Sequence, residues 1–439
     1  MSTDGSPKLP EQTEVGNYFV SNYPPYSQWL PKHVPAFEAA LANAPTDGPL
    51  GLYVHLPFCR QRCTYCYFRI HPRRPEQEID DYIDAVLAES TMFQQYDAVK
   101  GRPVSNVYFG GGTPTLLSAE QLRRLLGGLR SQMDWSSAKE VTCECQPGTV
   151  DREKLKVLKE FGVTRASIGM QSLTEDVLRR VGRAAGKADC IDTFQMVREI
   201  GFEQVNIDLL AGLPGETEET WKETIKGIIA LAPECVTIYQ LELTHNSPMY
   251  GAIKAGAETP LPPWSTKRQW VDDAFTQMEK AGYTIYGAYW AVRDPKQQRF
   301  AYVSEHYWRG HELLALGETA FGLIQGFHYQ NTDGYENYLL RSKNEVLSAA
   351  RAYPISHEEK FRRELILLLK TGHVDTVRLE EKFQISVQKV LAEELKALQD
   401  EGMLTFGPKS ISLTRQGLLC IDWLLPRLYL PQHKGVRYS

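Results

Sequence analysis

The segment Tyr53-Val-His-Leu-Pro-Phe-Cys59-Arg-Gln-Arg-Cys63-Thr-Tyr-Cys66-Tyr-Phe68 places three cysteines within eight residues, directly after an apolar run typical of a strand. Their spacing is Cys-x3-Cys-x2-Cys. Three thiolates on one short loop can hold three irons of a cubane cluster and leave the fourth iron without a protein ligand. An open metal position lets a small molecule bind and react. The segment therefore predicts a [4Fe–4S] cluster on Cys59, Cys63 and Cys66.

A zinc site is the main alternative, because cysteine is also a preferred zinc ligand. Zinc would need a fourth Cys or His, and His55 and His71 are close in sequence, so spacing alone leaves this alternative open. The other five cysteines are scattered and do not form a disulfide framework: Cys143, Cys145, Cys190, Cys235 and Cys420. This distribution indicates a reducing compartment, and we expect a cytoplasmic protein.

The composition is that of an ordinary globular protein, with 42% hydrophobic and 23% charged residues over 439 positions. A net charge of -5 offers no basic field for nucleic acid. The N-terminus lacks the apolar core of a signal peptide, and no window approaches the roughly 18 apolar residues of a membrane span. We expect a monomer that contacts neither nucleic acid nor the membrane interior.

Strand-like and helix-like patterns alternate between about residues 50 and 290. Strands are predicted at 52–55, 104–109, 141–145, 165–168, 205–210, 236–243 and 284–286, and helices near 78–96, 118–132, 151–161, 187–200, 217–231 and 266–281. Such repeats predict a parallel α/β sheet wrapped by helices. Composition does not distinguish an open sheet from a barrel. Residues 1–15 are predicted to be disordered, and residues 17–45 to form an ordered arm.

A different pattern begins after residue 340. Three helices are predicted at 356–370, 376–383 and 387–402, followed by β-prone segments at 404–406 and 410–413. This order predicts a winged-helix-like α+β module. The third helix carries more acidic than basic residues, so we expect it to pack on the main domain and not to bind DNA. The predicted domains are an arm (1–45), a barrel with an extension (46–340) and the C-terminal module (341–439).

The cysteine motif and its surroundings resemble the radical S-adenosylmethionine (SAM) superfamily. That resemblance implies a partial (β/α)6 TIM-type barrel, with the cluster at the C-terminal ends of the strands. It also implies that the cluster delivers one electron to SAM, which cleaves to methionine and a 5′-deoxyadenosyl radical. An electron donor such as flavodoxin or ferredoxin is then the implied partner.

Further segments resemble the HemN-like subgroup of this superfamily, which contains oxygen-independent coproporphyrinogen III dehydrogenase. A strand runs into the turn Gly110-Gly111-Gly112-Thr113, which lacks the lysine of a phosphate loop. Taken singly, each polar strand end can also be a cap or an ion pair. The resemblance implies SAM contacts from Tyr53, Tyr65, Gly110, Gly111, Gly112, Thr113, Glu144, Gln171, Arg183 and Asp208, and contacts to a second SAM from Gly317 and Ala320.

Three activities occur within the subgroup. The dehydrogenase decarboxylates porphyrinogen propionates, but Phe68 stands where it typically has a fourth cysteine. The haem chaperone (HemW) has a His-Asn-x-x-Tyr-Trp motif, and Val303 stands at the histidine position here. Class C methyltransferases and cyclopropanases transfer carbon from a second SAM.

We expect carbon transfer to an unsaturated substrate, because Tyr67 and Phe68 fit this less defined branch. A pocket lined by aromatic residues could hold that substrate; the alternative for the same residues is core packing. They are Tyr283, Tyr286, Tyr289, Trp290, Tyr302, Tyr307 and Trp308. Tyr239 and Glu242 are the candidate proton-handling residues; they alternate along one strand, so at most one faces the barrel interior.

Overall fold

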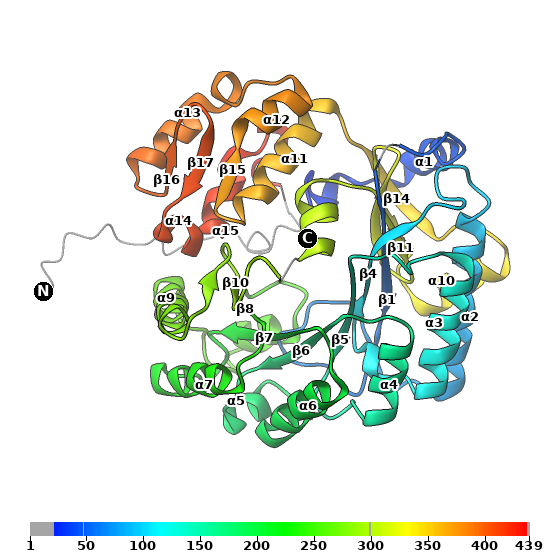
Figure 1. The fold of residues 1–439 in the computed structure, drawn as a ribbon, viewed down its shortest axis with the longest axis horizontal. Helices are drawn as coiled ribbons and strands as arrows, with labels where there is room; N and C mark the ends of the chain where they lie inside the picture. Colours follow the sequence, from blue (N-terminus) through cyan, green and yellow to red (C-terminus); the bar gives the residue numbers. More distant parts are fainter. Residues whose placement is uncertain (1–21, 47, 298–299, 437–439) are drawn as a thin grey trace, which may run out of the picture.

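The computed structural model describes residues 22–46, 48–297 and 300–436 (Figure 1). Its central sheet contains six parallel strands: β1 (Leu50–Leu56), β4 (Val104–Gly111), β5 (Glu140–Cys145), β6 (Arg165–Gln171), β7 (Gln204–Ala211) and β8 (Cys235–Gln240). The sheet does not close, because β1 also pairs with β11 (Leu313–Leu316) and β8 with the antiparallel β10 (Trp290–Val292). The predicted partial (β/α)6 barrel is therefore confirmed. The predicted disorder of residues 1–15 lies outside the described residues.

Helices follow the strands in chain order and cover the outer face of the sheet (Figure 1). Ser118 and Gln121 form a reciprocal capping box that starts α3, and the leucines of that helix face the core. The helices are α2 (Glu76–Phe93), α3 (Ala119–Gln132), α4 (Arg152–Glu160), α5 (Glu175–Arg180), α6 (Lys187–Ile200), α7 (Glu218–Leu231), α8 (Pro248–Lys254) and α9 (Trp264–Lys280). The sequence did not predict α5 and α8, because helices of one or two turns give no clear hydrophobic period.

The sheet is extended beyond β11 by three antiparallel strands that the sequence did not predict. They are β12 (Phe321–Ile324), β13 (Phe327–Asn331) and β14 (Ala349–Pro354), with α10 (Tyr335–Lys343) between the last two. The arm, with α1 (Val34–Ala40), packs on this extension. Trp29 stacks on His328 with ring centroids 4.7 Å apart, and the Tyr23 hydroxyl accepts a hydrogen bond from the Leu430 amide. The arm thus joins the extension to the end of the chain.

The C-terminal module has the winged-helix order of elements. These are α11 (His357–Leu369), β15 (His373–Asp375), α12 (Thr376–Phe383), α13 (Val387–Asp400), β16 (Leu404–Phe406) and β17 (Ser410–Leu413), followed by α14 (Arg415–Leu419) and α15 (Ile421–Leu424). Its apolar residues form one cluster with Tyr289, Trp290 and Trp308. The fully buried Arg268–Asp422 pair, 2.8 Å apart, joins the module to α9. The module therefore packs on the barrel, as expected; the domain boundaries stay a prediction.

Two expectations about the barrel need correction. Strand β8 ends at Gln240, so Glu242 lies in the following loop and the argument from strand alternation does not apply to it. Just after the strand, the Leu241 carbonyl accepts a hydrogen bond from the buried Lys267 ammonium, 2.8 Å away. Most of the aromatic stretch is core: Tyr289 and Trp308 are buried in the cluster shared with the C-terminal module. Tyr302 is also buried, and its ring is tilted against that of Tyr108, with ring centroids 4.9 Å apart.

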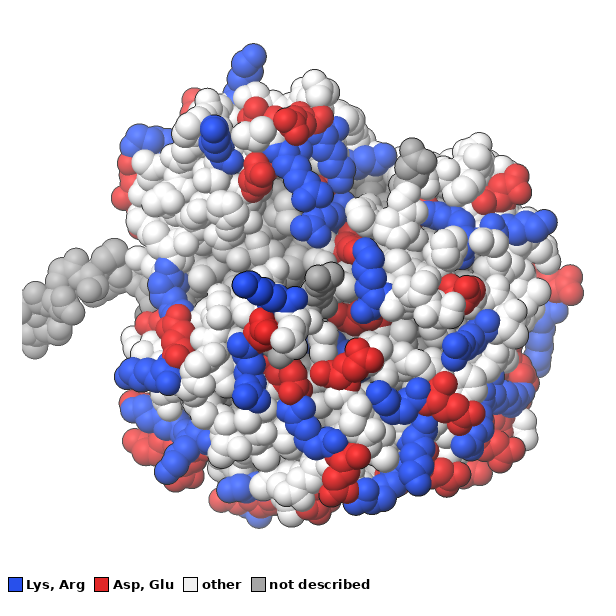
Figure 2. Space-filling view, viewed as in Figure 1, with Lys and Arg blue, Asp and Glu red and all other residues white. Residues whose placement is uncertain are grey.

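Short segments complete the description. They are β2 (Phe58–Cys59), β3 (His71–Pro72) and β9 (Thr284–Ile285), 3-10 turns at Tyr26–Gln28, Pro31–His33, Pro114–Leu116, Leu425–Leu428 and Pro431–His433, and a π-helical segment at Val303–Trp308. Acidic and basic side chains are interspersed on the face shown in Figure 2. Among the described residues, no helix has both the length and the apolar character needed to cross a bilayer.

Candidate functional site: a cysteine loop at the C-terminal ends of the barrel strands

The three cysteines lie on the loop between β1 and α2. The Cys66 amide donates to the Cys63 carbonyl (3.1 Å), and the Thr64 amide donates to the Val181 carbonyl after α5 (3.0 Å). All three thiols are half-buried, whereas the other five cysteines are buried. The fold therefore brings only the motif cysteines, of the eight in the chain, to a partly open surface.

The thiols lie close enough to influence one another. Burial raises the pKa of Cys59 to about 12, and the neighbouring Cys66 and Cys63 add to that rise. Burial likewise raises the pKa of Cys66 to about 11. A bound cation would be needed to hold such thiols as thiolates. This donor set fits the predicted iron–sulfur cluster.

The zinc alternative finds no support. His71 Nε2 is 2.6 Å from a carboxylate oxygen of Glu318, and His55 Nδ1 is 2.8 Å from the Tyr53 hydroxyl. The partners of these two histidine nitrogens are therefore Glu318 and Tyr53, and not the cysteines. Over residues 22–46, 48–297 and 300–436, no three His, Cys, Asp or Glu side chains converge as a metal-ion site. A mononuclear site needs ligands converging on one ion, whereas a cubane takes each thiolate on a different iron.

The triglycine turn packs directly on the end of β1. The Gly112 amide donates to the Leu56 carbonyl (2.9 Å), and a Cβ at Gly112 would lie 2.8 Å from the Phe58 oxygen. Gly111 has a φ of +111° and faces the ring of His55. Next in the chain, Thr113 places its hydroxyl oxygen 3.3 Å from Cys59 Sγ. Protein packing alone therefore requires glycine here, and the turn joins β4 to the cluster loop.

Glu144, at the end of β5, is held beneath this turn. Its carboxylate accepts from the Tyr108 hydroxyl (2.8 Å) and from the Gly111 amide (3.1 Å). Burial raises the pKa of Glu144 to about 7, and the charge of Asp208 acts in the same direction. Tyr108 was not predicted as a site residue. Its position two residues before Gly110, on the same face of β4, was the available signal.

Polar side chains on neighbouring strands line the barrel interior. Glu144, Gln171 and Asp208 are half-buried, whereas Cys143 and Cys145, which alternate with Glu144, are buried in the core as predicted. Asp208 accepts hydrogen bonds from Ser167 Oγ and Asn206 Nδ2, both at 2.9 Å. This alternation shows that the polar face of the sheet is the more open one. It is suited to a polar cofactor such as SAM.

Arg183 connects this face to the cluster loop. Its guanidinium donates to the Tyr65 hydroxyl (3.1 Å) and to the Gly169 carbonyl on β6. The Nε–H of Arg183 is buried without a hydrogen-bond partner among the described residues. A buried unsatisfied donor costs free energy, so a ligand acceptor at this position would be favoured. Tyr65 and Arg183 therefore fit the predicted SAM site as a pair.

The turn from Gly317 to Ala320 is buried beside the end of β1. The Gly317 amide donates to the buried Glu89 (2.9 Å), and the Tyr82 hydroxyl bridges the His55 carbonyl and the Glu318 amide. Glu89, Tyr82 and Glu318 were not predicted, because their roles depend on contacts distant in sequence. The turn thus supports the same strand end that carries the cysteine loop.

We predict that His71→Ala loosens the cysteine loop. Glu318 is fully buried and would lose its histidine partner, which corresponds to about 1–3 kcal/mol of unfolding free energy. Chemical denaturation measures this change, and iron content after dialysis reports loop integrity. His71→Gln, which retains a donor, serves as the matched control and should lose less. Equal stability and iron content in His71→Ala and the unmodified chain would contradict the prediction.

Each of the two candidate proton-handling residues lies near a different tyrosine. Tyr239 packs against Tyr289, with ring centroids 5.7 Å apart. Glu242 lies near the cluster loop, where burial chiefly raises the pKa of Tyr67 and the charge of Glu242 adds to it. A catalytic role for either residue stays a prediction.

Comparisons with known proteins show the family of the chain. The Radical SAM superfamily model matches residues 53–228, and the HemN C-terminal domain model matches residues 355–420. The haem chaperone HemW of Bacillus subtilis is 30% identical over 370 residues, covering 84% of this chain and 96% of that protein. The oxygen-independent coproporphyrinogen III oxidase of Escherichia coli is 27% identical, covering 88% and 86%. The solved structure of coproporphyrinogen III oxidase (HemN) from E. coli has a TM-score of 0.82 at 26% identity, covering 94% of this chain and 96% of that one.

These relatives overturn one expectation. Proteins that match over most of the chain are haem chaperones and coproporphyrinogen oxidases, so the prediction of a class C methyltransferase or cyclopropanase was wrong. The prediction rested on Tyr67, Phe68 and the aromatic stretch, and that stretch is mostly core packing.

The match over nearly the full length of HemW carries the assignment, together with the half-buried cysteines and the polar face of the sheet. Proteins of this family bind a [4Fe–4S] cluster and SAM. The chain belongs to the radical SAM superfamily, in its HemN-like subgroup.

Proposed function

We propose that the protein is a radical SAM enzyme that oxidatively decarboxylates a propionate side chain of a porphyrinogen. The HemN structure supports this reaction, because it matches 94% of the chain. When bound, the cluster and SAM supply a 5′-deoxyadenosyl radical that removes a hydrogen atom from the propionate. Loss of carbon dioxide and of one electron to an external acceptor then leaves a vinyl group.

One observation favours an enzyme over a haem carrier. Val303 occupies the position at which the chaperone has its histidine. The nearby His306 is 1% exposed, and a Cβ on Gly51 would lie 2.5 Å from its ring. His306 therefore lacks the space that an axial haem ligand needs. Phe68, where the oxidase typically has a fourth cysteine, does not remove any of the three cluster thiols.

The residues of this chain would bind and orient the cofactors. Cys59, Cys63 and Cys66 would hold the cluster. Gly110, Gly111, Gly112 and Thr113 would face the methionine part of SAM, and the other contacts would come from Tyr53, Tyr65, Glu144, Gln171, Arg183 and Asp208. The turn at Gly317 and Ala320 would contact a second SAM. A reduced cluster needs a reducing compartment, so the proposal places the protein in the cytoplasm. That the protein is a monomer stays a prediction.

Anaerobic assays with reconstituted protein, SAM, dithionite and coproporphyrinogen III test the proposal. We expect one 5′-deoxyadenosine and one carbon dioxide for each propionate converted, measured by mass spectrometry and trapped ¹⁴CO₂. Equilibrium dialysis with labelled SAM would count the bound molecules, and we expect two per chain. Tight haem binding without substrate-dependent SAM cleavage would instead establish the chaperone function, for which the HemW relatives argue.

A further inference from the structure

The loop that carries the cluster cysteines is strongly basic. Between Pro57 and Pro75 it contains five arginines and no aspartate or glutamate, in a chain whose net charge is -5. The arginines are Arg60, Arg62, Arg69, Arg73 and Arg74. The positive charge is therefore concentrated around the cluster site and is not a property of the whole protein.

Three of these arginines are exposed without an ion pair in the part of the chain that the structure describes, and one of them, Arg62, donates to the Cys66 and Phe68 carbonyls of its own loop (3.3 and 3.5 Å). The other two are Arg60 and Arg73. By contrast, Arg69 pairs with Asp333 (2.6 Å) and Arg74 with Glu78 (2.7 Å). Free surface arginines attract anionic partners because their charge is not neutralised locally.

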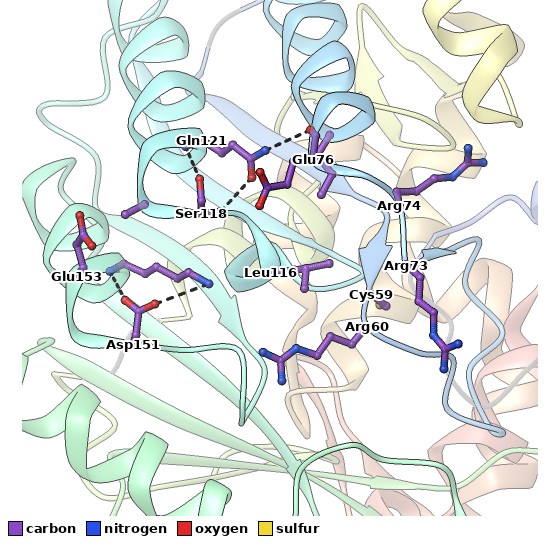
Figure 3. A pocket seen from close by; sticks show the side chains of 13 residues that line it. Cys59, Arg60, Arg73, Arg74, Glu76, Leu116, Ser118, Gln121, Asp151 and Glu153 are labelled. Carbon is purple, nitrogen blue, oxygen red and sulfur yellow. Dashed lines mark hydrogen bonds and ion pairs between the residues drawn. The ribbon is translucent and has the colours of Figure 1, made fainter.

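Arg60 and Arg73 line a cavity of about 510 Å³ together with Cys59, and their side chains lie on either side of Cys59 in Figure 3. On the opposite wall, Asp151 lies 3.9 Å from the Lys154 ammonium, and Glu153 lies 4.0 Å from Arg123. Glu76, in the first turn of α2, is the remaining carboxylate of the lining. The charge beside Cys59 is thus positive, and Cys59 is the one cluster cysteine that lines the cavity.

We propose that this surface, defined by Arg60, Arg73 and the cavity over Cys59, docks an acidic, low-potential one-electron carrier protein. The inference rests on the cluster chemistry of the proposed function. With a cluster held by Cys59, Cys63 and Cys66, the reduced carrier would give up one electron and be oxidised, and the cluster would accept that electron and be reduced. A short path from the surface to a cluster ligand favours that transfer. Complementary charge would steer encounter and set the register of docking.

The double variant Arg60→Glu/Arg73→Glu tests the surface. Titration calorimetry at low ionic strength would measure the Kd of oxidised flavodoxin, an acidic carrier, for the cluster-free and the reconstituted protein. We expect the Kd to rise about 10- to 100-fold, and the salt dependence of binding to weaken. Arg378→Glu/Lys389→Glu in the C-terminal module makes the same change in net charge and should leave the Kd within about two-fold.

Activity assays separate docking from catalysis. SAM cleavage driven by flavodoxin should slow in the double variant, whereas cleavage driven by dithionite should be unchanged. An unchanged flavodoxin Kd would overturn the inference, and so would an equal loss with both reductants. A raised KM for coproporphyrinogen with unaltered flavodoxin binding would assign the arginines to an anionic substrate instead. Absence of dithionite-driven cleavage in the unmodified protein, with flavodoxin binding intact, would count against the proposed function and not against the docking surface.

Discussion

Replacing any one of Cys59, Cys63 and Cys66 with alanine is expected to abolish iron binding and to lower SAM cleavage by more than about 100-fold. Loss of residues that merely orient metal ligands lowers metal affinity or activity by 10- to 100-fold, so loss of a ligand should exceed that. Each of the three thiols is half-buried on one loop, and no other cysteine lies near enough in the chain to replace it. Iron and sulfide analysis, with the absorption spectrum of the reconstituted protein, measures the effect.

Cys190→Ala is the matched control for these variants. Cys190 is a fully buried thiol on α6, outside the cluster loop. Loss of the Cys190 thiol should lower the free energy of unfolding modestly and leave the iron content of the protein unchanged. Retention of a full cluster in the Cys59, Cys63 and Cys66 variants together would disprove the cluster site.

The second large effect is expected at Glu144. Glu144→Gln should raise the Kd of SAM about 10- to 100-fold, because hydrogen bonds to a charged acceptor contribute roughly 1.5–3 kcal/mol. Glutamine keeps the size of the side chain and can accept from the Tyr108 hydroxyl, so the loss would report the charge. Glu120→Gln, at an exposed position of α3, makes the same carboxylate-to-amide exchange away from the site and is the control. An unchanged SAM affinity would remove Glu144 from the site.

The same residue predicts a pH dependence. Burial raises the pKa of Glu144 to about 7; Asp208 on β7 reinforces this, whereas Tyr108 on β4, Gly111 and Arg165 on β6 oppose it. The carboxyl is therefore protonated below pH 7 and becomes a stronger acceptor above it. SAM affinity should rise as the pH increases through about 7, and Glu144→Gln should flatten that profile. Calorimetric titrations from pH 6 to 8.5 would show the difference.

Much of this fold followed from local pattern. The six barrel strands and their main helices were predicted, because alternating and 3.6-residue periods arise from one buried face of each element. The C-terminal helices also matched closely, down to α12 at Thr376–Phe383. The strands β10 to β14 were missed because they are short, and because β10 and β11 join the sheet by pairing with β8 and β1, which lie far away in the chain.

By itself, the sequence determined the superfamily and predicted the cluster cysteines, because three thiols at close spacing act within one loop. Only the tertiary structure decided how the site is supported: Tyr108 beneath Glu144, Glu318 against His71, and Thr113 beside Cys59. It also showed that Glu242 lies beyond the end of β8 and that most of the aromatic stretch is core. The physical reason is that hydrogen bonding and burial depend on neighbours brought together by folding, which no local period records.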